Sequence, residues 1–374
     1  MVPNRTMRMP RLLRPLFCAK KGSAMATIWF CLVALMLAGY VILDGYDIGV
    51  GVLHLWIARD DASRRTLVAT IGPFWDGNEV WLLAAGGTLY FAFPLLYASG
   101  FSGFYLPLMM VLWLLIIRGV SLEFRSHVSA GVWPPFWDAG FSLASVLLAI
   151  FYGAALGNVV RGVPLDANGR FFEPLWTNLQ PYGQTGILDW YTVLIGIAAL
   201  AALSLHGAAW LIYKTDGELR QRSLRTSSLL WWVVALLTVL VTAASFELLP
   251  RLLQNFRAWP WGFIFPVLAL AGLLGVKWFL RAGADFLVFA ASCVYLVGML
   301  TSVTFSLYPS VLPSSTTPSF ALTISNAKAA DYGLEIGLIW WILGMALATG
   351  YTIFTHRSFS GKVQTDRAGQ NEGY

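Results

Sequence analysis

Long apolar segments separated by short polar connections dominate the sequence. Nine stretches reach about 20 residues or more, the length that a helix needs to cross ~30 Å of hydrocarbon. Only two connections are long, at 161–185 and 309–332, and their Pro, Gly, Ser, Thr and Asn content is typical of ordered surface loops. The pattern therefore predicts an all-α polytopic membrane protein. The predicted spans cover residues 27–55, 77–98, 100–120, 138–160, 186–213, 227–249, 261–280, 284–308 and 333–355.

Composition supports the membrane interpretation. The chain is 57% hydrophobic and only 12% charged, whereas soluble domains carry about 25% charged residues. This balance excludes a soluble enzyme, a disordered chain and a secreted disulfide scaffold. The three cysteines, Cys18, Cys31 and Cys293, show no CxxC spacing, so neither a disulfide framework nor a zinc site is predicted.

Basic residues divide unequally between the two sides of the predicted membrane. Fourteen lie in the loops after the first, third, fifth and seventh spans and in the C-terminal tail, and five lie in the opposite loops. Because cytoplasmic loops are enriched in Lys and Arg, the C-terminus is predicted in the cytoplasm and, with nine spans, the N-terminus outside. An even number of spans is the alternative and would place both ends inside. The loops explain the positive charge, so no nucleic-acid partner is predicted.

The first 24 residues conflict with this orientation. They carry six basic residues and no acid, yet nine spans would send them outward. They also lack the apolar core and small-residue cleavage site of a signal peptide. We therefore expect translation to start at Met25. On this interpretation residues 1–24 are a basic extension outside the true start, 25–357 a single transmembrane domain and 358–374 a polar cytoplasmic tail.

The first predicted span contains acids at membrane depth. Such residues cost at least ~2.5–3.5 kcal/mol on insertion scales and usually serve function. Asp44, Asp47 and His54 share one helix face, and Gly45 and Gly49 have the spacing that lets a second helix approach closely. The structural alternative is a packing seam in which a neighbouring hydroxyl or arginine pairs with the acids. Because two acids one turn apart exceed what packing needs, we expect a function for Asp44 and Asp47.

Two further polar clusters lie beside the second and third spans. Asp76 and Glu79 follow a Gly-Pro pair, which predicts either a helix N-cap with its reciprocal partner or a kinked helix through Pro73 that places both acids at membrane depth. Arg118 and Glu123 end the third span, where an exposed cytoplasmic loop is expected. The topology gathers all three clusters on the cytoplasmic side of one antiparallel three-helix unit. This arrangement indicates a proton inlet from the cytoplasm.

The sequence offers little for a metal or a nucleotide. Of the four histidines, only His206 lies well within a predicted span, and its neighbours are apolar. We therefore expect a hydrogen-bonded core residue there, and no metal site is predicted. No Walker, Rossmann or nucleophile-elbow motif is found.

Two of these polar strings resemble subunit II of the cytochrome bd-type quinol oxidases. They are residues 44–51 (DGYDIGVG) and 72–82 (GPFWDGNEVWL), and together at this separation they are highly specific. The resemblance extends from about Ala26 to Arg357. Shorter strings that fit the same family lie at 101–105, 123–126, 137–138, 157–158, 162–164, 308–309, 313–315, 322–324 and 326–327.

The resemblance implies a fold, a complex and a reaction. The fold would be two four-helix bundles plus one peripheral helix, paired as a heterodimer with a larger subunit I that ligates the haem b and haem d groups. The complex would oxidise membrane quinol and reduce O2 to water in the respiratory chain of a bacterial cytoplasmic (inner) membrane, generating a proton gradient without pumping. Subunit II would support subunit I and supply part of a cytoplasmic proton path, with membrane lipid and quinone around it. A small single-span subunit is left open.

The resemblance also assigns residues. It implies no catalytic residue in this subunit and leaves cofactor-binding residues unknown. His127 stands where some relatives have lysine. The predicted proton path, which combines the family's positions with the polar clusters above, consists of Asp44, Asp47, Trp75, Asp76, Glu79, Arg118 and Glu123.

Two alternatives from other classes stay open at this point. A proton-coupled secondary transporter would use Asp44 and Asp47 to bind the coupling ion, and matched broken helices in two halves of the chain would favour it, but no convincing pair is found. A purely structural scaffold would pair every buried acid with a neighbour.

Overall fold

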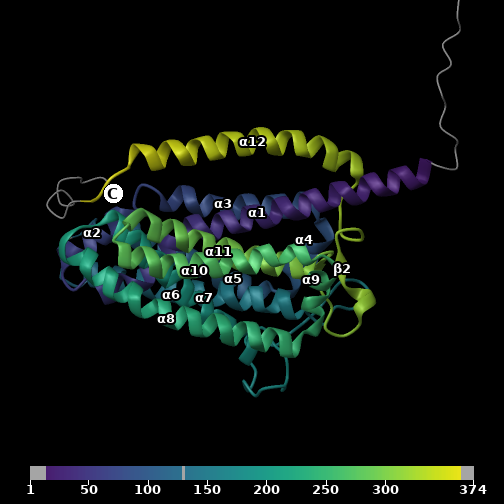
Figure 1. Ribbon diagram of the computed structural model, residues 1–374, viewed down its shortest axis with the longest axis horizontal. Coiled ribbons are helices and arrows are strands. Elements are labelled where there is room, and N and C mark those ends of the chain that lie inside the picture. Colours follow the sequence, from purple (N-terminus) through teal and green to yellow (C-terminus); the bar gives the residue numbers. More distant parts are fainter. Residues whose placement is uncertain (1–13, 129–130, 364–374) are drawn as a thin grey trace, which may run out of the picture.

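The computed structural model describes residues 14–128 and 131–363, and this part of the chain is almost entirely helical (Figure 1). Two short strands and three 3-10 turns lie between the later helices. In chain order the elements are α1 (Arg14–Ile57), α2 (Asp61–Ile71), α3 (Trp75–Ala92), α4 (Pro94–Gly103), α5 (Tyr105–Phe124), α6 (Trp133–Arg161), α7 (Trp190–Lys214), α8 (Gly217–Leu248), η1 (Pro250–Leu253), α9 (Gln254–Ala258), η2 (Pro260–Phe263), α10 (Ile264–Ala282), α11 (Asp285–Leu307), β1 (Ser310–Leu312), η3 (Pro318–Phe320), β2 (Leu322–Thr323) and α12 (Asp331–Ser358).

The number of membrane-crossing helices agrees with the prediction of about nine. Within the described residues, eight helices are long and apolar enough to span a bilayer, and α3, with 18 residues, falls on the remaining predicted span. The predicted span 77–98 is divided at Phe93, where the backbone leaves the helical region. Pro94 then starts α4, because proline lacks an N–H to donate and is best tolerated in the first turn of a helix.

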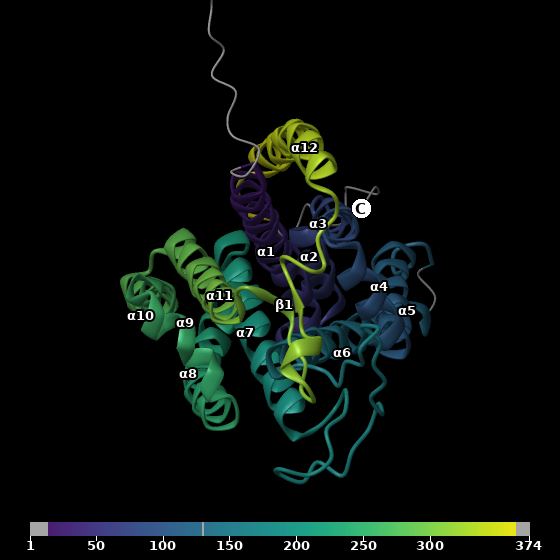
Figure 2. The ribbon, with the colours of Figure 1, turned by 90° about the vertical axis from the view of Figure 1, so that its right-hand side faces the viewer.

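The long helices form two bundles and one peripheral helix (Figure 2). The first bundle contains α1, α3, α5 and α6, and the second contains α7, α8, α10 and α11. Contacts of α7 with α1 and α6 join them. In both views α12 lies apart, above α1 and α3, and none of its most apolar 18-residue stretch is buried. The architecture implied by the resemblance is thereby confirmed.

Glycine lets the two bundles meet closely. A Cβ atom on Gly49 of α1 would lie 2.0 Å from the carbonyl oxygen of Leu203 on α7, and a Cβ on Gly207 would lie 2.3 Å from the carbonyl carbon of Gly49. The close approach expected from Gly45 and Gly49 is therefore confirmed, with α7 as the neighbouring helix. The acids of α1 lie on another side of this helix, where Asp44 meets α5 and Asp47 meets α3 within the first bundle.

The two long loops are ordered, as predicted. The β1–β2 pair is antiparallel, and an isolated bridge between Val163 and Ser314 ties the two loops together. Arg161 anchors the earlier loop by donating to both carboxylate oxygens of Glu173 at 2.9 Å and by pairing with Asp189. These contacts fix the ends of α6 and α7 on the side away from the acids of α1.

The N-terminal predictions are not settled by the fold. Helix α1 begins at Arg14, so its first residues belong to the basic extension. Residues 1–13 lie outside the described part of the chain. The start at Met25 and the division at residue 24 stay predictions.

Candidate functional site

A buried ion pair joins α1 to α5. Arg118 donates to both carboxylate oxygens of Asp44, from Nη1 at 3.1 Å and from Nη2 at 2.5 Å, and both side chains are 0% exposed. The expectation of an exposed loop at Arg118 is wrong, because α5 continues as a helix to Phe124 and turns this side chain inward. Bidentate geometry compensates part of the cost of removing two charges from water.

Asp47 lies one turn further along α1 in a different environment. Its Oδ2 accepts a hydrogen bond from the Asn78 amide at 2.8 Å, and the same amide nitrogen lies 2.7 Å from the Tyr46 hydroxyl. Its Oδ1 is buried and has no hydrogen-bond partner among the described residues. Asp47 is thus a buried carboxylate with one oxygen available to a proton or to water. Sequence reasoning does not single out Asn78, although it lies between Asp76 and Glu79 in the same string.

Asp76 and Glu79 of α3 continue the row of polar side chains that begins at Asp44 and Asp47 toward the surface. Helix α3 starts at Trp75 with Phe74 at the N-cap position, so the predicted N-cap role of Asp76 is wrong. The alternative of one helix through Pro73 is also wrong, because residues 72–74 separate α2 from α3. Asp76 is exposed and Glu79 is half-buried, and Glu79 lies within electrostatic reach of Asp44, Asp76 and Arg118.

Trp75 and Glu123, the remaining predicted residues, lie beside this row of polar side chains. Trp75 is half-buried, and its ring packs on Gly119 of α5, where a Cβ would lie 3.3 Å from the indole. Glu123 is exposed at the end of α5, as predicted. The structure therefore brings Asp44, Asp47 and Arg118 together, places Glu79 beside them and leaves Glu123 at the surface.

A second buried polar cluster lies nearer the C-terminal end of α1. Asp138 of α6 accepts from His54 Nε2 at 2.6 Å, from Arg125 Nε at 2.6 Å and from Arg64 Nη1 at 3.2 Å. Arg125, two residues after Glu123 in the segment where an exposed loop is expected, is also buried. Sequence reasoning passes over Asp138 because the predicted span begins at that residue, whereas α6 begins one turn earlier, at Trp133.

The surface end of this cluster is Asp61 of α2, whose side chain is 51% exposed. It accepts a 2.8 Å hydrogen bond from Arg125 Nη2. Partial burial opposes the shift, but the hydrogen bond and the charge of Arg125 hold the pKa of the Asp61 carboxyl below its usual value. Asp61 is therefore an ionised group at the water boundary.

His206 is a hydrogen-bonded core residue, as predicted. Its Nδ1 lies 2.8 Å from the Ser292 hydroxyl, and its Nε2 lies 2.9 Å from the carbonyl oxygen of Ile42. Both ring nitrogens are thus in use. Within the part of the chain that the structure describes, no group of three or more His, Cys, Asp or Glu side chains is placed to hold a metal ion.

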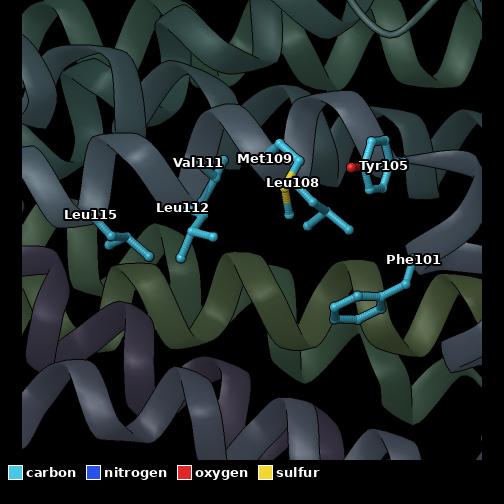
Figure 3. A pocket seen from close by; sticks show the side chains of 7 residues that line it. All are labelled: Phe101, Tyr105, Leu108, Met109, Val111, Leu112 and Leu115. Atoms are coloured by element: carbon cyan, nitrogen blue, oxygen red, sulfur yellow. The ribbon is translucent and has the colours of Figure 1, made fainter.

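An apolar pocket is lined by residues of α4 and α5, none of which belongs to either polar cluster (Figure 3). It has a volume of about 210 Å³, and its lining contains no titratable carboxylate. Phe101 of α4 faces Leu108 and Tyr105 of α5 across it. This surface suits a lipid chain or a neighbouring apolar helix rather than proton chemistry.

Comparisons with known proteins point in one direction. The family model described as cytochrome bd terminal oxidase subunit II matches residues 25–359. The probable cytochrome oxidase subunit 2 of Haemophilus influenzae is 31% identical, covering 92% of this chain and 97% of the relative. The cytochrome bd-I ubiquinol oxidase subunit 2 of Escherichia coli K12 is 28% identical, covering 92% and 96%. A chain of the bd oxidase from Geobacillus thermodenitrificans has the same fold, with a TM-score of 0.71, 19% identity and coverage of 90% and 98%.

Proposed function

The chain belongs to the cytochrome bd terminal oxidase subunit II family, and we propose on this basis that its own task is to conduct protons from the cytoplasm toward the site of oxygen reduction. The complex to which it contributes is a quinol oxidase of the bacterial inner membrane that uses haem and quinol and contains a partner subunit I. The family match favours this function over a proton-coupled secondary transporter.

The observation that carries the proposal is the contrast between Asp44 and Asp47. Asp44 and Asp47 lie a single turn apart on α1. Arg118 donates both of its hydrogen bonds to Asp44 and so neutralises that carboxylate. The uncompensated negative charge falls on Asp47, whose Oδ1 has no partner among the described residues. Because like charges close together disfavour double ionisation, a proton that enters this region is stabilised on Asp47.

The route to Asp47 follows the burial of the acids. Exposed Asp76 meets water at the start of α3, and half-buried Glu79 lies one turn further along the same helix. Trp75 forms the wall against α5, and exposed Glu123 adds a second proton-collecting carboxylate at the cytoplasmic surface. Each step transfers one proton between a carboxylate and water, and the last carboxylate in this chain to take up the proton is Asp47, next to the Arg118-paired Asp44.

We also propose how the chain sits in the complex. Haem b and haem d belong to subunit I, and the support is that His206 uses both ring nitrogens in hydrogen bonds. The C-terminus faces the cytoplasm and the N-terminus the outside, because the basic loops gather at the end of the bundles where α1 ends and α3 begins. A small single-span subunit completes the complex as a further proposal.

The experiment that tests the proton path replaces Asp47 by Asn in the complete complex. Asn keeps a polar group beside Asn78 and cannot carry a proton. We expect quinol-dependent oxygen uptake to fall by 10²-fold or more, about the loss expected for a direct acid–base group, with haem content near that of the wild type. Asp216→Asn, which removes an exposed cytoplasmic carboxylate outside the path, is the matched control. Unchanged oxygen uptake in Asp47→Asn would remove Asp47 from the path, and lost haem would favour the structural scaffold.

A further inference from the structure

A chain of charged side chains runs from the cytoplasmic surface to His54 in the interior. It starts at half-exposed Asp61, passes through Arg125 at 2.8 Å and reaches Asp138, which is 2.6 Å from Arg125 Nε. Asp138 lies 2.6 Å from His54 Nε2, and the His54 side chain is 0% exposed. A histidine at this depth, beside a carboxylate, is more than the packing of α1 on α6 needs.

The cluster fixes the state of the His54 ring. Two arginines donate to Asp138, with Arg64 Nη1 at 3.2 Å from Oδ2, so Asp138 is held as a carboxylate and accepts the proton of His54 Nε2. The charged groups that face His54 are therefore Asp138 of α6, Arg64 of α2 and Arg125 after α5. Nδ1 is left as the basic atom of the ring. It is buried and has no hydrogen-bond partner among the described residues. A carboxylate that orients one ring nitrogen in this way leaves the other ready for proton exchange.

His54 Nδ1 and Asp47 Oδ1 are two buried atoms on the same face of α1 that have no hydrogen-bond partner within residues 14–128 and 131–363. Seven residues separate them, a rise of about 10.5 Å along the helix. Gly51 lies between them and carries no side chain. The Ser145 hydroxyl of α6 fills its place, since a Cβ on Gly51 would lie 2.0 Å from Ser145 Oγ. Buried polar atoms without protein partners are commonly satisfied by ordered water.

We propose that His54, oriented by Asp138, stores a proton beside Asp47 and exchanges it with that carboxylate through water and the Ser145 hydroxyl. This rests on the proposed proton path. In the loading step a hydronium O–H bond breaks, an N–H bond forms at Nδ1 and water is released. In the return step the same proton passes by water to Asp47 Oδ1 and the ring is again neutral. The Asp138 carboxylate compensates the charge of the imidazolium, and Arg64 and Arg125 keep that state short-lived.

The test measures proton uptake by the complete complex in a single turnover with oxygen, followed by a pH-indicator dye. His54→Gln keeps an N–H donor for Asp138 and cannot store a proton. We expect proton uptake about tenfold slower, less than the 10²–10⁴-fold effect of a direct acid–base group, with unchanged haem spectra. Ser145→Ala, which leaves the His54–Asp138 pair intact, is expected to slow uptake in the same direction. Arg65→Gln, at an exposed position beside the cluster, is expected to match the wild type.

Chemical rescue separates proton storage from a packing role. In His54→Ala, added imidazole is expected to restore fast uptake, whereas pyrrole, a ring of the same size with no basic nitrogen, is not. Wild-type uptake in His54→Gln, equal rescue by both rings, or loss of haem in both His54 variants would each overturn the inference. If Asp47→Asn slows oxygen uptake while His54→Gln does not slow proton uptake, the proton path stands and the storage role fails. If Asp47→Asn has no effect, the proton path itself fails.

Discussion

Arg118 and Asp44 form an ion pair that is closed to solvent, although their helices are not each other's main neighbours. Helix α5 packs chiefly on α6, but its Arg118 side chain donates to both carboxylate oxygens of Asp44 on α1. Each side chain is 0% exposed. Because an isolated charge inside the protein is far more costly than a paired one, each member of the pair depends on the other.

This dependence predicts a strong coupling between the two positions. Arg118→Gln alone leaves the Asp44 carboxylate buried and unpaired, and we expect it to destabilise the complex by about 3–5 kcal/mol. The double variant Asp44→Asn/Arg118→Gln removes both charges and is expected to lose less stability than either single variant. Thermal unfolding of the purified complex, monitored by haem absorbance, measures all three. Additive losses would show that the two residues do not act as a pair.

The contact between α1 and α7 predicts a steric effect that involves no charge. A Cβ on Gly207 would lie 2.3 Å from the Gly49 carbonyl carbon and 2.5 Å from the Val50 nitrogen, both of which are backbone atoms. We expect Gly207→Ala to lower stability by about 1–3 kcal/mol, as overpacking does. Gly350→Ala on α12, where a Cβ would meet nothing within 4 Å, is the matched control. Equal melting temperatures of the two variants would contradict the close approach.

These two contacts show how far the sequence determines the site. Apolar periodicity predicts the helices, and the spacing of Asp44, Asp47 and Gly49 predicts a polar face with a close neighbour. The spacing does not show which helix supplies a partner for these residues. The pairing of Arg118 with Asp44, 74 positions apart, depends on tertiary packing. Arg118 was therefore expected in water.

Helix boundaries explain most of the other differences. A shift of one turn at the start of α6 moves Asp138 from a predicted boundary into the interior, where it collects His54 and two arginines. Helix α3 likewise begins at Trp75 rather than after a cap at Asp76. Sequence patterns locate a helix end only to within a few residues. A difference of that size decides whether a side chain such as Asp138 lies at a helix end or inside a buried cluster.

The exposed position of Asp76 predicts a moderate effect on proton entry. Water and the second surface carboxylate, Glu123, offer alternatives to it, so we expect Asp76→Asn to slow oxygen uptake by less than Asp47→Asn does. Haem content should stay near normal, because the Asp76 side chain lies at the surface. Steady-state oxygen uptake with excess quinol measures the rate. An effect larger than that of Asp47→Asn would require a different order of groups in the path.

The Asp61–Arg125 pair predicts a small stability term that depends on pH. The pKa of Asp61 is lowered in the folded state, so the pair stabilises the protein above the unfolded pKa of about 3.9 and this contribution is lost as pH falls through the folded value. Since Asp61 is half-exposed, we expect Asp61→Asn to cost less than about 1 kcal/mol at pH 7. The difference between variant and wild type should begin to shrink near pH 4 and vanish only below the lowered folded-state pKa of Asp61. A constant difference across this range would assign the effect to something other than the carboxylate charge.

The end of α12 predicts a test of orientation that does not depend on the proton path. Lys214 of α7 is buried and donates to the carbonyl oxygens of Phe359 at 2.6 Å and Gly361 at 3.1 Å, while the Val363 amide donates to the Lys214 carbonyl at 2.8 Å. These bonds hold the chain beside Lys362, a trypsin site, against the bundle. Lys214→Met keeps the apolar stem and loses the two side-chain hydrogen bonds, so we expect trypsin to cut after Lys362 faster than in the wild type.

The faster cleavage should occur in inside-out membrane vesicles and not in right-side-out ones, because the C-terminus is proposed to face the cytoplasm. Cleavage confined to right-side-out vesicles would reverse the orientation, and equal rates in variant and wild type would show that Lys214 does not hold this segment.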